Sequence, residues 1–520
     1  MKTLNFKIVI NLMGMMMLMN ALFMLLPVII SLIYRDGLHF HLILSSVLVA
    51  FLGGITYFST KKAKKKLGKR EGYLVVGIGW IVLVLTGMVP YLISSTCLPE
   101  IALEKNSWSL TNLFFETMSG YTTTGSTIFN DIEVIPESIL FWRSLTHWIG
   151  GMGIIVLAIA ILPFLGIGGM QLFVAESSGI ETNKLHPRIT DTAKRLWFLY
   201  VFLTFVQTIL LWMFGMNLFD AVNHSMSSIS SGGFSTKNAS TSNWNHSAAI
   251  QYTIILFMFF AGTNFIMLYH LMKGRFKTLL QNEEFKWYLG VVLSISVIVS
   301  CIVFLHSEPG NNSIPFAQIN AETGRYTFEN SFRYSLFQVV SIITSTGFTS
   351  ADHGAWPPFV MMIFFALLFV GASAGSTSGG IKIVRHVILL KNCWFELKRL
   401  IHPNAIIPVR YNKKAVSQTV VYNVMAFFAT YMFIWIASSV LMTLLNSNSF
   451  VSEFDFISNA SLTASSLGNV GPGLGHYGPV NNLSGLTDSA KWFTSFLMIL
   501  GRLELFTILI LFTPFLWKSN

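Results

Sequence analysis

Long apolar stretches separated by short polar segments run along almost the whole chain. A helix that crosses a bilayer core needs about 20 mostly apolar residues. Ten stretches come close to this length: Ile8–Ile33, Leu38–Phe58, Tyr73–Ser95, Ile139–Ile167, Ala193–Phe214, Ala249–Leu271, Leu289–Leu305, Phe359–Val387, Ala415–Leu445 and Trp492–Trp517. The pattern therefore predicts ten transmembrane helices, the eighth of them broken by a glycine-rich interruption.

The first stretch has a second interpretation, because Lys2 and Lys7 precede it as in a signal peptide. The apolar core of a signal peptide has about 7–15 residues and is followed by a cleavage site of the Ala-x-Ala type. The stretch Ile8–Ile33 is longer, and no such site follows it. We therefore expect it to be a retained span.

Composition excludes a string of soluble domains. Of the 520 residues, 53% are hydrophobic and 11% are charged, whereas soluble globular proteins carry about 25% charged residues. The three cysteines, Cys97, Cys301 and Cys393, are far apart in the sequence and indicate neither a disulfide framework nor a metal site. No catalytic constellation or phosphate-binding loop motif is present, so we expect no enzyme activity.

The net charge of +11 is distributed as in a membrane protein. With the N-terminus placed in the cytoplasm, 26 of the 34 basic residues fall in the predicted inner segments, as the positive-inside rule requires. The run Lys61–Arg70 is the strongest topological signal, and we expect it to lie at the inner leaflet. It lacks an aromatic platform, which argues against a nucleic acid partner.

A fourfold repeat appears in the segments between the spans. Four segments align on a final glycine, and each has a serine six residues before it: Met118–Gly125, Met226–Gly233, Val340–Gly347 and Ala464–Gly471. The first three also carry a hydroxyl residue two positions after the glycine, and the fourth has Gly473 there. A period of this kind indicates a repeated structural unit.

A short apolar segment precedes each of these glycine loops. The four segments are Leu110–Gly120, Leu218–Ile229, Ser331–Ile343 and Phe454–Leu467. Each is too short to cross a bilayer. We expect a short helix that enters the membrane and returns as an extended loop. Such a loop is tolerated at that depth only where it is buried in protein or lines water, so the four loops are expected to face a common axis.

The composition of the four loops is typical of a site that dehydrates a monovalent cation. Glycine permits positive φ, so that successive carbonyl groups can point in one direction, and rings of carbonyl oxygens replace the hydration shell of potassium in channels. The aligned segments contain no carboxylate, which a divalent cation usually requires. A single such loop is also compatible with an ordinary turn or a helix-packing contact; the fourfold repetition favours a shared pore.

These residues resemble the TrkH/TrkG/KtrB family of potassium transporters, and the TrkH branch most closely. The pieces that carry the resemblance cover nearly the whole chain: Thr122–Thr127, Trp142–Gly153, Ser231–Thr236, Thr344–Thr349, Leu467–Gly475 and Gly501–Pro514. It implies an all-α membrane protein with four span–pore-helix–span repeats around a central pore, plus two extra N-terminal spans. The corresponding divisions are an extension over 1–71 and repeats over 72–192, 193–286, 287–414 and 415–520.

The resemblance also implies the residues of a potassium filter. These are Thr122, Thr123, Thr124, Gly125, Ser231, Gly232, Gly233, Ser345, Thr346, Gly347, Asn469, Val470 and Gly471. In related plant proteins a serine at the first glycine position is associated with sodium permeation, so Gly125 favours potassium. The fourth loop, with Asn469 and Val470, departs most from a threonine-rich filter and implies an asymmetric one.

The resemblance further implies a cytoplasmic-side gate below the filter, at Gly371, Gly375, Gly379, Gly380, Lys382 and Arg502. Glycines destabilise a helix by about 1 kcal/mol each relative to alanine, so Gly371–Gly380 predicts a break or loop, with a close helix-packing face as the alternative. Lys382 is expected to extend to the inner surface. Arg502 lies within the last span, where a charge usually faces a cavity or pairs with another helix.

Together these features predict potassium uptake across the bacterial inner membrane, with potassium as the transported substrate and no covalent cofactor. By resemblance, the partners are a second copy of the chain in a homodimer and a cytoplasmic nucleotide-binding subunit of the TrkA type. The basic segments 273–286 and 382–414 are the expected docking surface, or else membrane-surface anchors. A sodium-permeable pathway and a proton- or sodium-coupled transporter remain open, with Glu504 as the mid-span carboxylate that coupling would use.

Overall fold

The computed structural model is almost entirely helical and describes residues 4–62, 68–165, 189–306, 326–405, 407–446 and 456–517. Residues 63–67 of the predicted anchor Lys61–Arg70, and the start of the predicted segment Phe454–Leu467, lie outside these residues. The first elements are α1 (Phe6–Phe23), α2 (Leu25–Tyr34), α3 (His39–Thr60), α4 (Lys69–Gly87), α5 (Val89–Ser94) and α6 (Glu100–Lys105).

Four further groups of elements follow, each containing one short buried helix. The first two comprise α7 (Leu110–Tyr121), α8 (Glu137–Leu165), α10 (Ile189–Met213), α11 (Leu218–Ile229), η2 (Ser240–Trp244), α12 (Ala248–Ala261) and α13 (Phe265–Met272). The last two comprise α14 (Phe276–Gln281), α15 (Glu283–Leu305), α16 (Phe328–Ile343), η3 (His353–Ala355), α17 (Pro358–Leu367), α18 (Ile383–Ile401), β1 (Arg410–Tyr411), β2 (Lys414–Ala415), α19 (Gln418–Asn446), α20 (Phe456–Gly468), η4 (Gly475–Tyr477), α21 (Asp488–Arg502), α22 (Phe506–Leu509), η5 (Ile510–Phe512) and α23 (Pro514–Trp517).

Six helical segments in the described part are long and apolar enough to cross a membrane, and two bent helix pairs raise this to eight. The two other predicted spans correspond to α8 and to the shorter α17. Large apolar side chains on the outside of these helices are exposed. On α3, for example, Phe40, Phe51 and Phe58 are about two-thirds exposed, at 64%, 66% and 67%. In water such a surface would be unfavourable, whereas lipid accommodates it.

Two spans that the sequence predicted as continuous are bent, and this is a correction. The Ala249–Leu271 span turns by 114° between α12 and α13, and the Trp492–Trp517 span turns by 110° after α21. At the first bend, the Asn264 side chain accepts hydrogen bonds from the amides of Ile266 and Met267 and so starts a new helix. At the second, Glu504 and Leu505 both adopt positive φ, which ends a right-handed helix.

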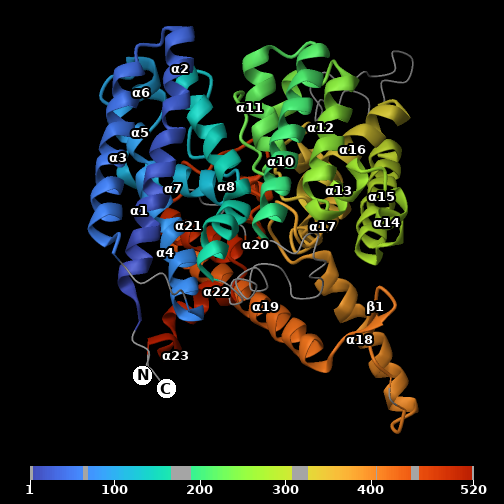
Figure 1. Cartoon of the computed structure of the whole chain (residues 1–520). Coiled ribbons are helices and arrows are strands. Elements are labelled where there is room, and N and C mark those ends of the chain that lie inside the picture. The colour runs from blue at the N-terminus through green and yellow to red at the C-terminus, as the bar shows by residue number, and fades with distance from the viewer. Residues whose placement is uncertain are drawn as a thin grey trace.

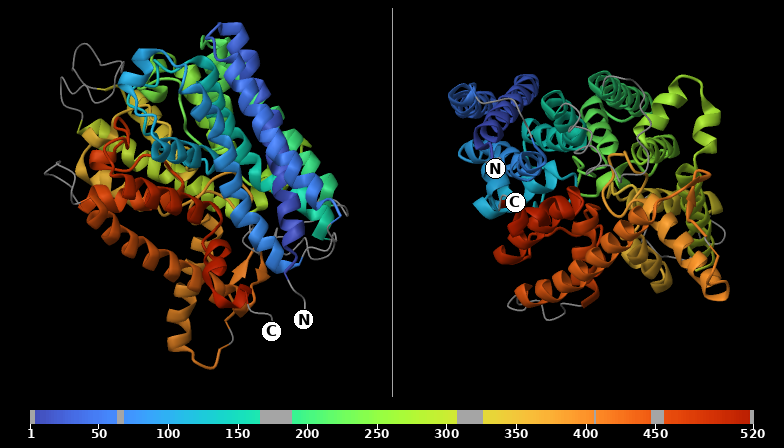
Figure 2. Two further views of the ribbon diagram at one scale, coloured as in Figure 1. Left: turned by 90° about the vertical axis from the view of Figure 1, so that its left-hand side faces the viewer. Right: turned by 60° about the horizontal axis from the view of Figure 1, so that its bottom comes forward.

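The arrangement of the helices supports the predicted topology. The beginning of α1 and the helix α23 lie at the same end of the molecule, as an even number of crossings requires (Figure 1). The lower part of α18 and the β1–β2 hairpin project from that end (Figures 1 and 2). This hairpin, in which Arg410 pairs with Ala415, is a small departure from an all-α fold.

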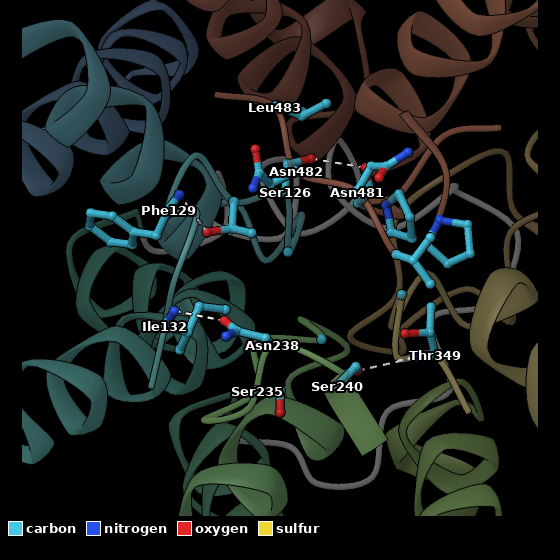
Figure 3. Close-up of a pocket in the computed structure, with 18 of the residues that line it drawn as sticks. Ser126, Phe129, Ile132, Ser235, Asn238, Ser240, Thr349, Asn481, Asn482 and Leu483 are labelled. Atoms are coloured by element: carbon cyan, nitrogen blue, oxygen red, sulfur yellow. Dashed lines mark hydrogen bonds between the residues drawn. The ribbon is translucent and has the colours of Figure 1, made fainter. Parts of the chain in front are cut away.

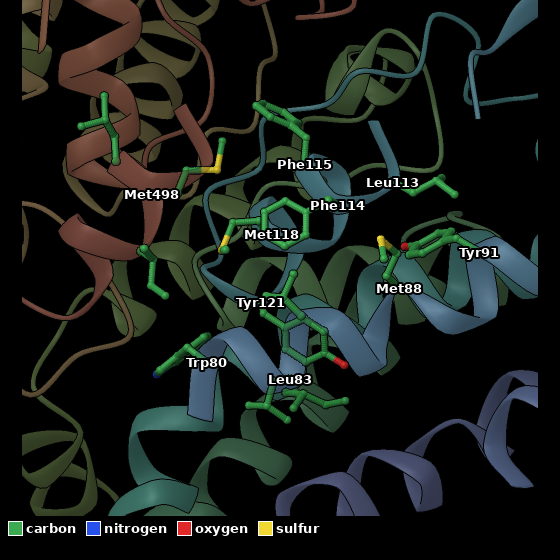
Figure 4. Packing of buried hydrophobic residues seen from close by; sticks show 14 of the residues in the cluster. Trp80, Leu83, Met88, Tyr91, Leu113, Phe114, Phe115, Met118, Tyr121 and Met498 are labelled. Atoms are coloured by element: carbon green, nitrogen blue, oxygen red, sulfur yellow. The ribbon is translucent and has the colours of Figure 1, made fainter. Parts of the chain in front are cut away.

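The four short helices α7, α11, α16 and α20 occupy the positions that the short apolar segments predicted. They are enclosed by the longer helices, and every residue of α7 from Asn112 to Tyr121 is buried. Figure 4 shows the apolar side chains of α7, including Phe114 and Met118, packed together with Trp80 and Leu83 of α4. This packing holds α7 at a fixed depth and so fixes the start of the loop that follows it.

Candidate functional site

The four glycine loops share one backbone conformation. Each loop has positive φ at the aligned glycine and again two residues before it. The glycines are Gly125, Gly233, Gly347 and Gly471, with φ between 75° and 106°, and the preceding residues are Thr123, Ser231, Ser345 and Asn469, with φ between 51° and 58°. Non-glycine residues rarely adopt positive φ, and where they do the surrounding structure enforces it. Four equivalent occurrences indicate a conformation required by the site.

The serine that recurs six residues before each glycine anchors its loop through its backbone. The carbonyl oxygen of this serine accepts a hydrogen bond from the amide of the residue just before the glycine, at 2.8–2.9 Å. The four bonds run from Thr124 to Ser119, Gly232 to Ser227, Thr346 to Ser341, and Val470 to Ser465. Each bond closes the C-terminal turn of a short helix and leads the chain into the extended loop.

The four loops meet in a closed ring. A methyl group added at Gly125 would lie 2.1 Å from the carbonyl oxygen of Gly232 in the second loop. Equivalent overlaps occur around the ring. A methyl group on Gly233 would lie 1.9 Å from the carbonyl oxygen of Thr346 in the third loop, and one on Gly347 would lie 2.0 Å from that of Val470 in the fourth. A methyl group on Gly471 would lie 2.5 Å from the carbonyl oxygen of Thr124, which brings the ring back to the first loop. Only glycine fits these positions, because any side chain would overlap a neighbouring carbonyl oxygen.

The structure thus brings together every residue that the sequence assigned to a filter. Four carbonyl groups, one from each loop, lie against the glycine of the adjacent loop. The threonine hydroxyl groups bond within their own loops, with 2.8 Å between those of Thr122 and Thr124 and between those of Thr344 and Thr346. The backbone oxygens therefore provide the ring, and these hydroxyls brace it.

A cavity of about 130 Å³ opens on one side of the ring and is lined by all four glycines. Figure 3 shows side chains from the different loops around it, including Ser126, Ser235 and Thr349. Its lining also contains the basic residues Arg143 and Lys237. In the predicted topology this cavity faces outward.

Two carboxylates of the outer loops lie beside lysines. Asp131 pairs with Lys105 at 2.5 Å, and Glu133 lies 3.7 Å from Lys237. The hydrogen bond from Lys105 lowers the pKa of Asp131, and a second bond from Asn238 acts in the same direction. Asp131 therefore stays ionised near neutral pH. Both carboxylates pair with lysines in the outer loops, and neither lines the cavity.

The fourth loop departs from the other three, as expected from its sequence. The Asn469 side chain donates hydrogen bonds to the Thr124 hydroxyl at 3.0 Å and to the Met498 carbonyl at 2.8 Å. It thereby ties the fourth loop to the first loop and to α21. The Asn469 amide therefore links the fourth loop of the ring to the first, and the other three loops have no amide side chain at this position.

Residues 368–382 form a loop beneath the ring, on the side opposite the cavity. The Thr377 hydroxyl lies 2.9 Å from the Ser231 hydroxyl, and the Gly379 amide donates to the Ser345 hydroxyl at 2.6 Å. A methyl group on Gly379 would lie 2.3 Å from the Gly468 carbonyl oxygen. The glycine-rich segment is thus a loop that contacts three of the four ring loops, and the alternative of a helix-packing face is wrong.

Two basic residues lie at this loop. The Lys382 ammonium group donates to the carbonyl oxygen and the hydroxyl of Ser378 and is buried, so the expectation that it extends to the inner surface is wrong. Arg502, at the end of α21, donates to the Thr377 carbonyl at 2.8 Å and to the Gly150 carbonyl of α8 at 3.2 Å. Arg502 therefore joins three different parts of the chain beneath the ring.

Glu504, the mid-span carboxylate, forms an ion pair with Arg385 of α18 at 2.5 Å. The Arg385 guanidinium also lies over the Phe427 ring, with its central carbon 3.8 Å from the ring centroid. This pair joins the corner after α21 to the helix that follows the inner loop. It gives Glu504 a structural partner that the sequence did not identify.

Two further residues beside the ring were not identified from the sequence. His147 is buried and stacks on Phe234, with ring centroids 3.9 Å apart. Glu116 of α7 pairs with Arg143 of α8 at 2.6 Å. A carboxylate within an apolar segment was the available signal for this pair. Among the described residues, no cluster of His, Cys, Asp or Glu could hold a metal ion.

Known proteins resemble this chain over almost its full length. The sequence model of the TrkH family, described as a cation transport protein, matches residues 39–519. The Trk system potassium uptake protein TrkH of Salmonella typhimurium is 36% identical over 99% of this chain and 100% of its own length. The corresponding protein TrkG of Escherichia coli K12 is 31% identical over 100% of both chains.

A solved structure shows the same architecture. The crystal structure of the potassium transporter TrkH from Vibrio parahaemolyticus superposes with a TM-score of 0.84 at 33% sequence identity, covering 99% of this chain and 100% of that one. The apolar helices, the glycine ring and these matches agree in placing the protein in a membrane as a transporter. The chain belongs to the TrkH family of cation transport proteins.

Proposed function

We propose that this protein takes up potassium across the bacterial inner membrane, through a filter that the four glycine loops form. The ring of loops is the observation that carries the proposal. Carbonyl oxygens from all four loops converge where glycine alone fits, and such oxygens can replace the hydration shell of a potassium ion. The names of the relatives, which are potassium uptake proteins, support the same ion.

The architecture behind this function is four span–pore-helix–span repeats around one axis, with the first two spans added at the N-terminus. The equivalent backbone geometry of the four loops supports the repeats. The filter residues are those predicted from the sequence, with the carbonyl groups before the glycines as the ion-facing oxygens. The outward cavity supplies ions to them.

The gate of the proposed pathway is the loop 368–382 together with Arg502. The loop lies beneath the ring and bonds to it through Thr377 and Gly379. Arg502 bonds this loop to α8 and places a positive charge there. A cation that leaves the filter toward the cytoplasm must pass both, so displacement of the loop would open the pathway.

Control of this gate from the cytoplasm has a structural route. The amide of Ala374 in the loop donates to Glu284 at the start of α15, at 2.6 Å. The neighbouring Glu283 pairs with Lys391 and accepts a hydrogen bond from the amide of Asn412, in the turn of the β1–β2 hairpin. The two basic segments 273–286 and 382–414 therefore meet near the gate. A nucleotide-binding subunit of the TrkA type, docked there on a homodimer, would act on the loop through these bonds.

Growth of a bacterial strain without its own potassium uptake systems tests the proposal. Expression of this chain is expected to restore growth in low-potassium medium, and added sodium is not expected to replace the potassium. The control is that the cells contain the folded protein in their inner membrane. If growth is then not restored, either with or without a TrkA-type partner, the proposal is contradicted.

Proton coupling is the main rival mechanism, and Glu504→Gln tests it. We expect the pH dependence of potassium uptake to be the same in the variant and the wild-type protein, because Glu504 is held by Arg385 in a structural ion pair. Uptake by both proteins is measured over a series of external pH values at constant membrane potential. A pH response of the wild-type protein that the variant lacks would favour coupled transport.

A further inference from the structure

One face of α8 is wedged between the first and second loops. Arg143, Thr146 and His147 lie on this face, spaced three and four residues apart. A methyl group on Gly120, at the end of α7, would lie 2.3 Å from the Thr146 hydroxyl, and one on Gly232 would lie 2.3 Å from a ring nitrogen of His147. These contacts leave no free space between α8 and either loop, so the side chains of α8 fix how far apart the two loops lie.

Glu116 holds the outgoing strand of the first loop. This carboxylate is fully buried. It accepts hydrogen bonds from the Thr127 hydroxyl at 3.1 and 3.2 Å and from the Ile128 amide at 3.0 Å. Its third partner is the Nε of Arg143, at 2.6 Å. A buried carboxylate with three donors is a stiff support, because hydrogen bonds to a charged group are the strong ones.

Arg143 carries the same connection into the second loop. Its terminal nitrogen donates to the Ser235 carbonyl at 2.9 Å. Its guanidinium carbon lies 3.5 Å from the centroid of Phe234, the residue that follows Gly233. The planar guanidinium therefore binds Glu116 with one side and the second loop with the other. The pair joins the two loops directly behind their glycines.

The position that Glu116 occupies has a counterpart in each repeat, nine residues before the glycine. The four residues are Glu116, His224, Gln338 and Leu462. His224 lies 2.9 Å from the Ser235 hydroxyl, whereas Gln338 reaches Ser350 and Ala351 only at 3.4 and 3.5 Å, and Leu462 has no polar side-chain atom. The charged support is therefore confined to the side of the ring formed by the first two loops.

We propose that Glu116 and Arg143 are positioning residues that set the ion selectivity of the filter. They do so by fixing the spacing of the first and second loops. The inference rests on the proposed function, since it assumes that the ring is the filter. Neither side chain needs to contact the ion: each acts through the backbone that it holds. A ring whose loops shift apart at this side would lose the carbonyl spacing that discriminates potassium from sodium.

Three substitutions separate this role from a general loss of structure. Glu116→Gln keeps the size of the side chain but places an amide NH₂ among donors. Arg143→Lys keeps the positive charge but loses the two-sided contact. Thr127→Val removes one hydroxyl at nearly constant shape. Each substitution is expected to lower the ratio of potassium to sodium flux. For Glu116→Gln and Arg143→Lys we expect a fall of about tenfold, the factor that corresponds to one hydrogen bond to a charged group. For Thr127→Val we expect a smaller fall.

The control is Leu462→Met, a volume-conserving change at the equivalent position of the fourth loop, which is expected to leave the ratio unchanged. Potassium and sodium fluxes are measured for the wild-type protein and all variants in liposomes, together with their elution profiles and melting temperatures. Thr127→Val keeps the test valid if a member of the pair does not fold.

The outcomes separate the inference from the function on which it rests. If the folded Glu116→Gln, Arg143→Lys and Thr127→Val proteins all retain the preference for potassium, the positioning role is overturned and the proposed function stays intact. An equal loss in Leu462→Met would also overturn it, because any buried change would then suffice. Wild-type protein without a potassium preference would contradict the proposed function itself.

Discussion

Gly125→Ser is expected to abolish most of the preference for potassium over sodium. The new Cβ would lie 2.1 Å from the Gly232 carbonyl oxygen, on a backbone with a φ of 81°. Left-handed backbone costs an L-residue roughly 1–2 kcal/mol, and the overlap displaces the carbonyl of the second loop as well. Two of the four loops are therefore disturbed at once, and we expect the flux ratio to fall by at least about tenfold, as about 1.4 kcal/mol implies.

The control for this substitution is Gly485→Ser. Gly485 is exposed, and a Cβ added there would meet no atom within 4 Å. The ratio of potassium to sodium flux is measured for both variants and for the wild-type protein. Unchanged selectivity in folded Gly125→Ser protein would show that the ring does not select the ion.

Arg502→Ala is expected to increase cation flux strongly. The substitution removes a positive charge from the space beneath the ring and the two hydrogen bonds through which Arg502 links the loop 368–382 to α8. At a separation of about 8 Å and an effective dielectric constant of about 20, one charge raises the energy of a passing cation by ~2 kcal/mol. Its removal corresponds to an increase in rate of about thirtyfold.

Arg502→Lys distinguishes the two contributions to this barrier. Lysine retains the charge but lacks the planar fork that reaches both the Thr377 and Gly150 carbonyl groups. We expect its flux to lie between those of the wild-type protein and Arg502→Ala. Flux is measured in proteoliposomes with equal amounts of folded protein. If Arg502→Ala conducts no more than the wild-type protein, Arg502 is not part of the gate.

The sequence predicted the helical architecture well because lipid imposes a simple rule on it. Every predicted span corresponds to a helix or a broken helix, and the four short helices lie where the short apolar segments indicated. The aligned glycines were equally informative. At these four positions a carbonyl oxygen of the adjacent loop lies so close that no side chain fits, so the need for a ring leaves a direct trace in the sequence.

Features that depend on tertiary contacts were not predictable in the same way. The bends after α12 and α21 are set by the capping side chain of Asn264 and by positive φ at Glu504 and Leu505, and a single polar residue within an apolar span does not by itself predict a bend. His147 shares its apolar surroundings with Trp148, and hydropathy alone could not show that it turns toward Phe234. The partners of Arg502 lie 125 and 352 residues away along the chain.

The inner loop shows the same limit for charged residues. Lys382 has the flexible side chain and the position near a span end that normally allow a lysine to reach the membrane surface. It instead folds back onto Ser378, because the loop carbonyls offer acceptors at closer range. Local composition predicted that the loop exists, and the contacts of the folded chain determined where its charge lies.

A flux measurement shows most directly whether the ring of glycine loops is a potassium-selective filter. Proteoliposomes that contain only this chain receive potassium, rubidium, sodium or lithium as the sole permeant cation, without a proton gradient. We expect flux driven by the ion gradient alone, with potassium and rubidium well above sodium and lithium. Equal sodium flux would contradict a potassium-selective filter, and flux that begins only when a proton gradient is imposed would contradict channel-like permeation.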